Sequence, residues 1–227
     1  MLKLISFMLL LLTFASAAED PIARWEKAVG GREKVAAIKA IYREGTIEFA
    51  GMQGAIKVWH TSDGRYRKEE RVATNWLIES FDGNTGMVQA GPQAPRGMSE
   101  EELRQNRSKR FANSNAMFFV FFPERHRGTR TVEDGNTVVF TPDGGIEWRI
   151  TLDPQTSLPQ EMVHREGDKT ITARFTSYET VDGVKLEKEI QRSAGDPSRS
   201  AVIRFTKTVI NPPIDESLFS IAGIMAQ

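Results

Sequence analysis

The clearest indication of fold class in this 227-residue chain is the segment Ile146-Glu147-Trp148-Arg149-Ile150-Thr151-Leu152-Asp153. Apolar and polar residues alternate along it without a break. Successive side chains of a β-strand point to opposite faces of the sheet, so this pattern predicts a strand with one buried and one solvated face. Such half-buried strands are typical of antiparallel sheets.

The same alternation recurs along most of the chain. Residues 41–49, 170–176 and 203–209 repeat it, and Asp-Gly turn dipeptides begin at residues 63, 82, 134, 143 and 182. We count about eleven candidate strands, joined mostly by short turns. Consecutive hairpins must curl to cover their shared apolar face. The sequence therefore predicts a mainly β protein, an incomplete antiparallel β-barrel of about eleven strands.

Two segments predict helices that cover the opening of this barrel. The first spans residues 21–38, with a break at Gly30-Gly31. The second follows Ser99, because Ser99 and Glu102 have the spacing of a capping box. The basic residues of 104–110 at its end are typical of a solvated face that complements the helix dipole. Contact with anionic lipid head groups is the alternative.

The N-terminus has the parts of a secretory signal peptide. Lys3 is followed by a nearly unbroken apolar run over 4–14, and Ala15-Ser16-Ala17 fits a signal-peptidase site. The run is shorter than the roughly 20 residues that a membrane helix needs. We therefore predict a signal peptide over 1–17, a single domain over 18–227, and no transmembrane anchor after cleavage. An uncleaved N-terminal anchor is the alternative.

Cysteine is absent from the sequence, and charge is balanced. No disulfide, thiolate catalysis or Cys-ligated metal is therefore expected, nor the acylated cysteine of a bacterial lipoprotein. Extracellular eukaryotic domains of this size commonly contain cysteines, so the composition favours export to a bacterial periplasm. Lys+Arg and Asp+Glu both number 30. Without a positive excess to displace counterions from phosphates, we expect no nucleic-acid partner.

Catalytic and metal-binding motifs do not occur in the sequence. It has no H-E-x-x-H, G-x-S-x-G, P-loop or G-x-G-x-x-G pattern, and its three histidines, His60, His126 and His164, are isolated. Glu69 and Glu70 should point to opposite faces of one strand. We expect no enzyme, no cofactor and no metal. Convergence of the three histidines on a metal in the folded protein is the alternative.

The segment 117–122, Met-Phe-Phe-Val-Phe-Phe, is the positive signal for function. Phe118, Phe119, Phe121 and Phe122 are four of the chain's 13 phenylalanines. They either fill the barrel as core or also line a cavity beneath a movable helix. Such a cavity would hold an acyl chain without catalytic residues, because burial of each CH₂ contributes about 0.8 kcal/mol.

Several turn motifs together point to a known family. Phe81-Asp82-Gly83-Asn84-Thr85-Gly86 is similar to a "(Y/F)DGKTG" turn, and Leu152-Asp153-Pro154-Gln155-Thr156-Ser157-Leu158-Pro159 to an "LDPxTxLP" hairpin. Segments 178–186 and 205–219 have the matching strand–turn–strand and closing patterns. The chain thus resembles the outer-membrane lipoprotein-sorting carriers, the Lol-type superfamily. Its charged segment 65–71 is a departure that makes it look like a divergent member.

The resemblance implies an incomplete barrel whose helices plug the opening over a hydrophobic cavity. It also implies a soluble periplasmic carrier that binds a lipid or an acylated lipoprotein, in outer-membrane lipoprotein sorting or related lipid transport. From alternation, we expect the cavity and its lid to be lined by Ile47, Phe49, Trp76, Ile78, Phe118, Phe119, Phe121, Phe122, Trp148, Ile150, Phe175 and Phe205. A slip of one residue in any strand would reverse its facing.

Two other functions stay open at this point. One is an envelope protein-binding module that has a solid core, no ligand, and exposed strand edges for its protein partners. The other is an esterase- or glycosidase-like enzyme. It would need a nucleophile or carboxylate motif, which the sequence lacks.

Overall fold

The structure is a computed structural model that describes residues 19–196 and 200–220, so the predicted signal peptide lies outside the described residues. The described chain forms four α-helices and two 3₁₀ turns: α1 (Pro21–Ala28), α2 (Arg32–Ala36), α3 (Glu100–Lys109), η1 (Asn113–Asn115), α4 (Ala116–Val120) and η3 (Glu216–Phe219). Its strands are β1 (Ala40–Phe49), β2 (Met52–Thr61), β3 (Tyr66–Val72), β4 (Asn75–Phe81), β5 (Gly86–Ala90), β6 (Arg96–Gly97), β7 (Gly128–Glu133), β8 (Thr137–Pro142), β9 (Trp148–Leu152), β10 (Pro159–Glu166), β11 (Lys169–Val181), β12 (Val184–Ala194) and β13 (Ala201–Ile210).

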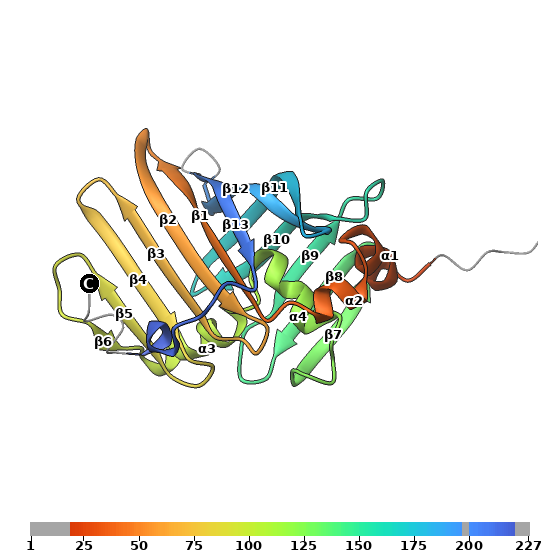
Figure 1. The fold of residues 1–227 in the computed structure, drawn as a ribbon, viewed down its shortest axis with the longest axis horizontal. Coiled ribbons are helices and arrows are strands. Elements are labelled where there is room, and N and C mark those ends of the chain that lie inside the picture. Colours follow the sequence, from red (N-terminus) through yellow and green to blue (C-terminus); the bar gives the residue numbers. More distant parts are fainter. Residues whose placement is uncertain (1–18, 197–199, 221–227) are drawn as a thin grey trace, which may run out of the picture.

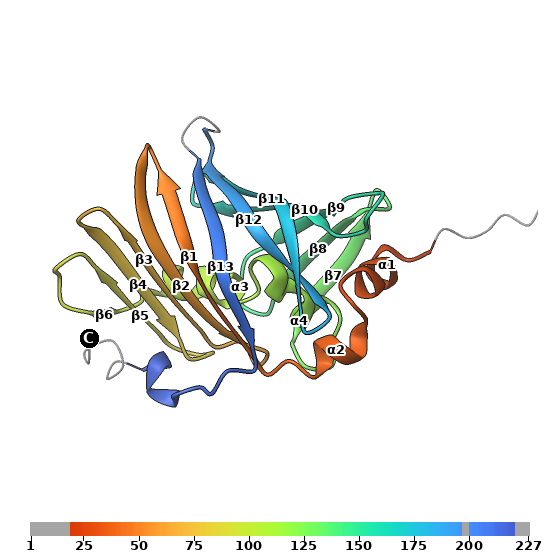
Figure 2. The ribbon, with the colours of Figure 1, turned by 45° about the horizontal axis from the view of Figure 1, so that its top comes forward.

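All the strands belong to one antiparallel sheet. Its spatial order is β6-β5-β4-β3-β2-β1-β13-β12-β11-β10-β9-β8-β7, so two meanders meet where β1 pairs with β13. The sheet curls around α3 and α4 without closing, and β6 and β7 lie at its two ends (Figures 1 and 2). The predicted incomplete antiparallel barrel is confirmed. It has 13 strands where about eleven were expected, because a two-residue strand such as β6 has no recognisable period.

The predicted turns and helix signals occupy the expected places. Each of the five Asp-Gly pairs lies between consecutive strands. Asp182 and Gly183 both have positive φ, 50° and 78°, as the tight hairpin between β11 and β12 requires. The Ser99 hydroxyl accepts a hydrogen bond from the N–H of Glu102, whose carboxylate accepts one from the N–H of Ser99. The capping box of α3 is therefore confirmed.

The break between α1 and α2 falls at Gly30-Gly31, as expected. Gly30 has φ +117°, and a Cβ there would lie 2.1 Å from the Gly183 carbonyl oxygen. The Lys185 N–H also donates to the Val29 carbonyl at 2.9 Å. The end of α1 is thus fastened to the β11–β12 hairpin. The second helix stops at Ala36, short of the predicted end, because β1 begins at Ala40.

Candidate functional site

A cavity of about 600 Å³ lies between the curled sheet and the end of α3. Its size is within the 300–1,000 Å³ typical of ligand pockets. The apolar part of its lining consists of Ile47, Phe49, Ile56, Val58, Val72, Leu77, Ala112, Trp148, Ile171, Ala173, Ile190, Ala194, Ala201, Ile203 and Phe205. The polar part consists of His60, Tyr66, Lys68, Glu70, Glu79, Lys109, Asn113, His164, Glu166, Arg192 and Ser193.

Strand alternation places the apolar residues on the inner face. Ile47 of β1 pairs with Ile203 of β13, and both line the cavity. Gly45 lies opposite Phe205 at a register shift after Glu44. A Cβ on Gly45 would lie 2.0 Å from the Arg204 carbonyl oxygen. The glycine thus permits close approach of the two strands at the point where Phe205 enters the cavity wall.

The polar lining contains a charged wall, formed by Lys68, Glu70, Glu79, Lys109, Glu166 and Arg192. Lys68 Nζ lies 2.7 Å from Glu79 Oε2 and 3.4 Å from Glu70 Oε1. Lys109 Nζ donates to Glu79 Oε1 at 3.1 Å. Arg192 Nη2 donates to Glu70 Oε1 at 3.2 Å. Residues from β3, β4, α3 and β12 therefore form one connected ion-pair network along the cavity.

Electrostatics keep this network ionised. Burial raises the pKa of Glu79, but Lys109 and Lys68 outweigh it and hold that pKa far below its usual range. Burial is likewise outweighed at Glu70, where Lys68 and Arg192 lower the pKa. Both carboxylates are therefore charged at neutral pH.

The histidines do not converge on one point. His60 lines the cavity, and burial lowers its pKa to about 3, with help from Arg43 and Lys68, so it is neutral at pH 7. His164 stacks on Trp148 with centroids 3.9 Å apart, and its Nε2 lies 3.1 Å from Glu166 Oε1. His126 packs elsewhere, with Nε2 3.0 Å from the Ser62 carbonyl oxygen. Over residues 19–196 and 200–220, no group of three or more His, Asp or Glu side chains is arranged to hold a metal ion.

Four of the predicted lining residues, Ile47, Phe49, Trp148 and Phe205, line this cavity. Phe175 instead lines a small pocket of about 10 Å³, and Ile150 is fully buried in the core. Ligand binding by any of these side chains stays a prediction.

The expected facing of β4 is wrong. Leu77 and Glu79 line the cavity, so Trp76 and Ile78 point to the opposite face. Residues 76–78 are all apolar, and the alternation of β4 therefore does not mark its inner face. The outer face is also covered, because Ser80 Oγ donates to the Leu218 carbonyl of the C-terminal segment at 3.2 Å.

The phenylalanines of segment 117–122 pack in the core. Phe118, Phe119, Phe121 and Phe122 are each at most 2% exposed, and none is among the residues that line the 600 Å³ cavity. The Phe121 ring meets Trp25 of α1 edge-on, with centroids 4.9 Å apart. These four phenylalanines therefore fill the core and do not line the 600 Å³ cavity. The cavity is covered instead by the chain just before it, at Lys109, Ala112 and Asn113.

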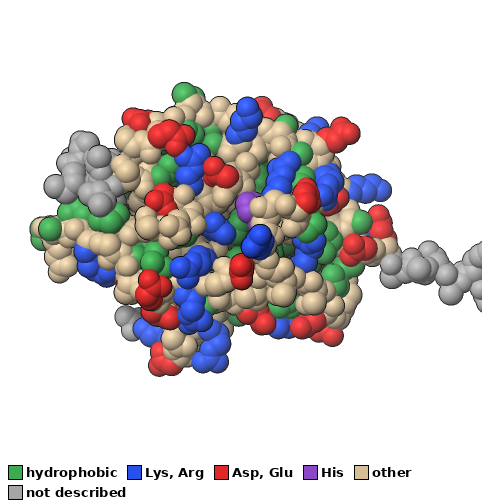
Figure 3. Space-filling view, turned by 90° about the horizontal axis from the view of Figure 1, so that it is seen from below, with side chains coloured by type: hydrophobic (Ala, Val, Ile, Leu, Met, Phe, Trp, Pro, Cys, Tyr) green, Lys and Arg blue, Asp and Glu red, His purple; other side chains and the backbone are tan. Residues whose placement is uncertain are grey.

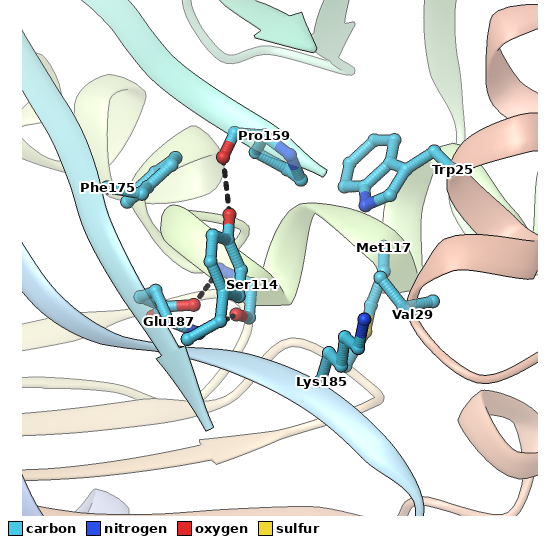
Figure 4. Close-up of a pocket in the computed structure, with 9 residues that line it drawn as sticks. Trp25, Val29, Ser114, Met117, Pro159, Phe175, Lys185 and Glu187 are labelled. Carbon is cyan, nitrogen blue, oxygen red and sulfur yellow. Dashed lines mark hydrogen bonds between the residues drawn. The ribbon is translucent and has the colours of Figure 1, made fainter. Parts of the chain in front are cut away.

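A buried ion pair between Arg43 of β1 and Glu187 of β12 lies next to η1, and Figure 4 shows Glu187 beside Ser114. Arg43 Nη1 donates to Glu187 Oε1 at 2.5 Å, and Glu187 Oε2 accepts the N–H of Ser114 at 3.2 Å. The Arg43 guanidinium also stacks on Phe205, 3.6 Å from the ring centroid. Arg43 was not among the residues predicted from the sequence. Its position two residues after Ile41 puts it on the same inner face of β1, which is the sequence feature that could have identified it.

The basic run 104–110 is mostly engaged in contacts within the protein. Arg104 pairs with Glu101, Lys109 with Glu79, and the Arg110 guanidinium lies 4.7 Å from the centre of the Phe111 ring. The face seen from below carries basic and acidic side chains interspersed (Figure 3). This arrangement supports a structural role for the run over contact with anionic lipid head groups.

The interior of the described chain is not solid, in contrast to the core expected of a protein-binding module. Edge strands are present at β6 and β7, and Val132 on β7 is 39% exposed. Binding of an envelope protein at an edge stays a prediction.

The fold is shared with solved structures of Lol-type proteins. A LolA superfamily protein from Nitrosomonas europaea matches with a TM-score of 0.55 at 10% identity, covering 91% of this chain and 98% of that one. A putative outer membrane lipoprotein-sorting protein domain from Vibrio parahaemolyticus matches with a TM-score of 0.50 at 11% identity, covering 86% and 96%. A DUF1329 family protein from Desulfovibrio piger has a TM-score of 0.52 at 14% identity, covering 88% and 98%.

At these identities the similarity shows the fold and leaves ligand and role open. No protein-family model matches the chain, and no curated protein matches it. Among the residues that the structure describes, none of the helices has the length and apolar character needed to span a bilayer.

Proposed function

We propose that this protein is a periplasmic carrier that holds an acyl chain of a lipid or of an acylated lipoprotein inside its curled sheet. The observation that carries the proposal is the 600 Å³ cavity, whose apolar wall is built from β1, β2, β11 and β13. Periplasmic location follows from the predicted signal peptide, and envelope proteins would deliver and receive the ligand.

Apolar burial is sufficient to hold such a ligand. About ten buried methylenes would contribute about 8 kcal/mol before the cost of immobilising the chain. Ile47, Ile203 and Phe205 supply contiguous apolar surface from two paired strands. No reactive group is needed for this kind of binding.

The chemistry of the cavity supports binding over catalysis. A general acid at neutral pH needs a carboxyl whose pKa is raised, as in glycosidases. Glu70 and Glu79 have lowered pKa values, because their cation partners outweigh the effect of burial. Each is also held in ion pairs with lysine or arginine. We therefore propose no enzymatic activity for this site.

The test measures ligand binding by the wild-type protein and by a variant whose cavity is filled by a large side chain. Native mass spectrometry of protein purified from a bacterial periplasm should show co-purifying lipid. Ala201 lines the cavity, whereas its neighbour Val202 lies on the opposite side of β13. Ala201→Trp should abolish binding of a fluorescent C12 acyl probe, and the matched Val202→Trp should retain it. Protein that carries no lipid and takes up no probe would refute the proposal.

A further inference from the structure

The cavity has two chemically distinct sides. Ile47, Ile203 and Phe205 form an apolar side, and the charged wall defined above forms the other. A bare hydrocarbon filling the cavity would strip water from ionised groups without replacing its hydrogen bonds, which is unfavourable. A ligand with a polar group that contacts the charged wall would therefore bind more favourably than a bare hydrocarbon.

The charged wall is balanced in sign. It holds three cations, Lys68, Lys109 and Arg192, and three carboxylates, those of Glu70, Glu79 and Glu166. Cations and carboxylates alternate in space, since Lys68 lies between Glu70 and Glu79, and Glu79 lies between Lys68 and Lys109. A head group bearing one net charge would leave that charge uncompensated within the cavity.

Hydrogen-bonding capacity remains on both kinds of group. A guanidinium has five N–H donors and an ammonium has three. The structure gives Arg192 one hydrogen bond to a carboxylate, from Nη2, and gives Lys109 one, to Glu79. On the Glu166 carboxylate, Oε1 is the oxygen that forms a hydrogen bond with His164 Nε2. Donors for an anionic group and an acceptor for a cationic group therefore face the same cavity.

We propose that the ligand is an amphiphile with a zwitterionic head group, such as a phosphocholine or phosphoethanolamine ester. Its anionic group contacts Arg192 and Lys109, its cationic group contacts the carboxylates, and its acyl chain lies along Ile47, Ile203 and Phe205. This inference rests on the proposed carrier function and names the ligand class that the same cavity takes.

The first test compares head groups on one chain length. Dodecylphosphocholine, laurate, dodecylammonium and lauroylglycerol are titrated into the full mature protein below their micelle concentrations, at pH 7.5 and constant ionic strength. Dodecylphosphocholine should bind on the order of tenfold more tightly than either singly charged amphiphile, with lauroylglycerol between them. Tightest binding of laurate, dodecylammonium or lauroylglycerol would overturn the inference.

The second test changes the charge of the wall. Glu79→Gln gives it one excess positive charge and should move the preference toward laurate. Lys109→Met gives it one excess negative charge and should move the preference toward dodecylammonium. The matched control is Glu161→Gln, which removes a carboxylate paired with Arg174 on the outer surface and should leave all four affinities unchanged. Unaltered preferences in both wall variants, shown by circular dichroism to be folded, would overturn the inference.

The outcomes separate this inference from the proposed function. Equal binding of all four amphiphiles by the wild-type protein, lost in Ala201→Trp, would refute head-group recognition and leave the carrier function standing. Failure of every amphiphile to bind would refute both. The titration of the four amphiphiles into the wild-type protein does not depend on the folding of any variant, so it tests head-group recognition by itself.

Discussion

Glu79 is the residue at which the two lysines of the charged wall meet. Lys68 Nζ lies 2.7 Å and Lys109 Nζ 3.1 Å from its two carboxylate oxygens. Its side chain is 11% exposed, so these partners replace most of the water that an ionised carboxylate would otherwise bind. A single substitution here therefore changes both the stability of the protein and the charge of the cavity.

Stability should fall in acid because of this carboxylate. The folded-state pKa of Glu79 is lowered, so below the unfolded-state pKa of about 4.3 the unfolded chain binds more protons than the folded one. This contribution to the free energy of unfolding is complete above that pH and is lost as the pH falls toward the folded pKa. Urea denaturation between pH 7 and pH 3 should show the loss.

Glu79→Gln provides the comparison, since it removes the titrating group. Its free energy of unfolding should vary less over the same pH range than that of the wild type. Identical pH profiles for the two proteins would show that the lysines do not stabilise the charged form of Glu79.

At the scale of elements, the end of α1 is fixed by close backbone contact with the β11–β12 hairpin. Gly30→Ala should lower the free energy of unfolding by more than about 1 kcal/mol, because the new Cβ meets the Gly183 carbonyl at a positive φ. Gly31→Ala is the matched control, with φ +101° and no atom within 4 Å of its Cβ. Chemical denaturation should give the smaller loss for Gly31→Ala, and equal losses would argue against the steric contact.

Phe121, directly after helix α4, and Phe205 of strand β13 have different roles. Phe121→Ala should lower the free energy of unfolding by about 3–5 kcal/mol, because Phe121 is 1% exposed and packs against Trp25. Phe205→Ala should destabilise less, because one side of its ring faces the cavity, and should weaken acyl binding. Denaturation and probe titration on both variants measure the two effects. Weaker binding in Phe121→Ala than in Phe205→Ala would contradict this division.

At the scale of the whole molecule, the cavity couples ligand binding to folding. It is assembled from β1–β4, β9–β13 and the end of α3, so it exists only when both meanders are in place. A ligand that binds the folded state alone at 100 times its Kd should raise the free energy of unfolding by about 2.7 kcal/mol. Thermal unfolding with dodecylphosphocholine measures this, and Ala201→Trp should show no such increase.

Features that depend on near neighbours could be predicted from the sequence alone. Alternation in 146–153, the Asp-Gly turns, the Ser99 capping box and the break at Gly30 each involve contacts within a few residues or the conformational limits of one residue. These features were sufficient to predict a curled antiparallel sheet with inserted helices.

Which surfaces form the core and which line the cavity depends on long-range packing. The facing of β4 depended on what covers its outer side, and the C-terminal segment does so from more than a hundred residues away. Phe121 became core because α1 brings Trp25 against it. Arg192 and Glu70 are 122 positions apart, and only the curl of the sheet brings them together. Local pattern fixes how a strand alternates, whereas long-range packing fixes what each face meets.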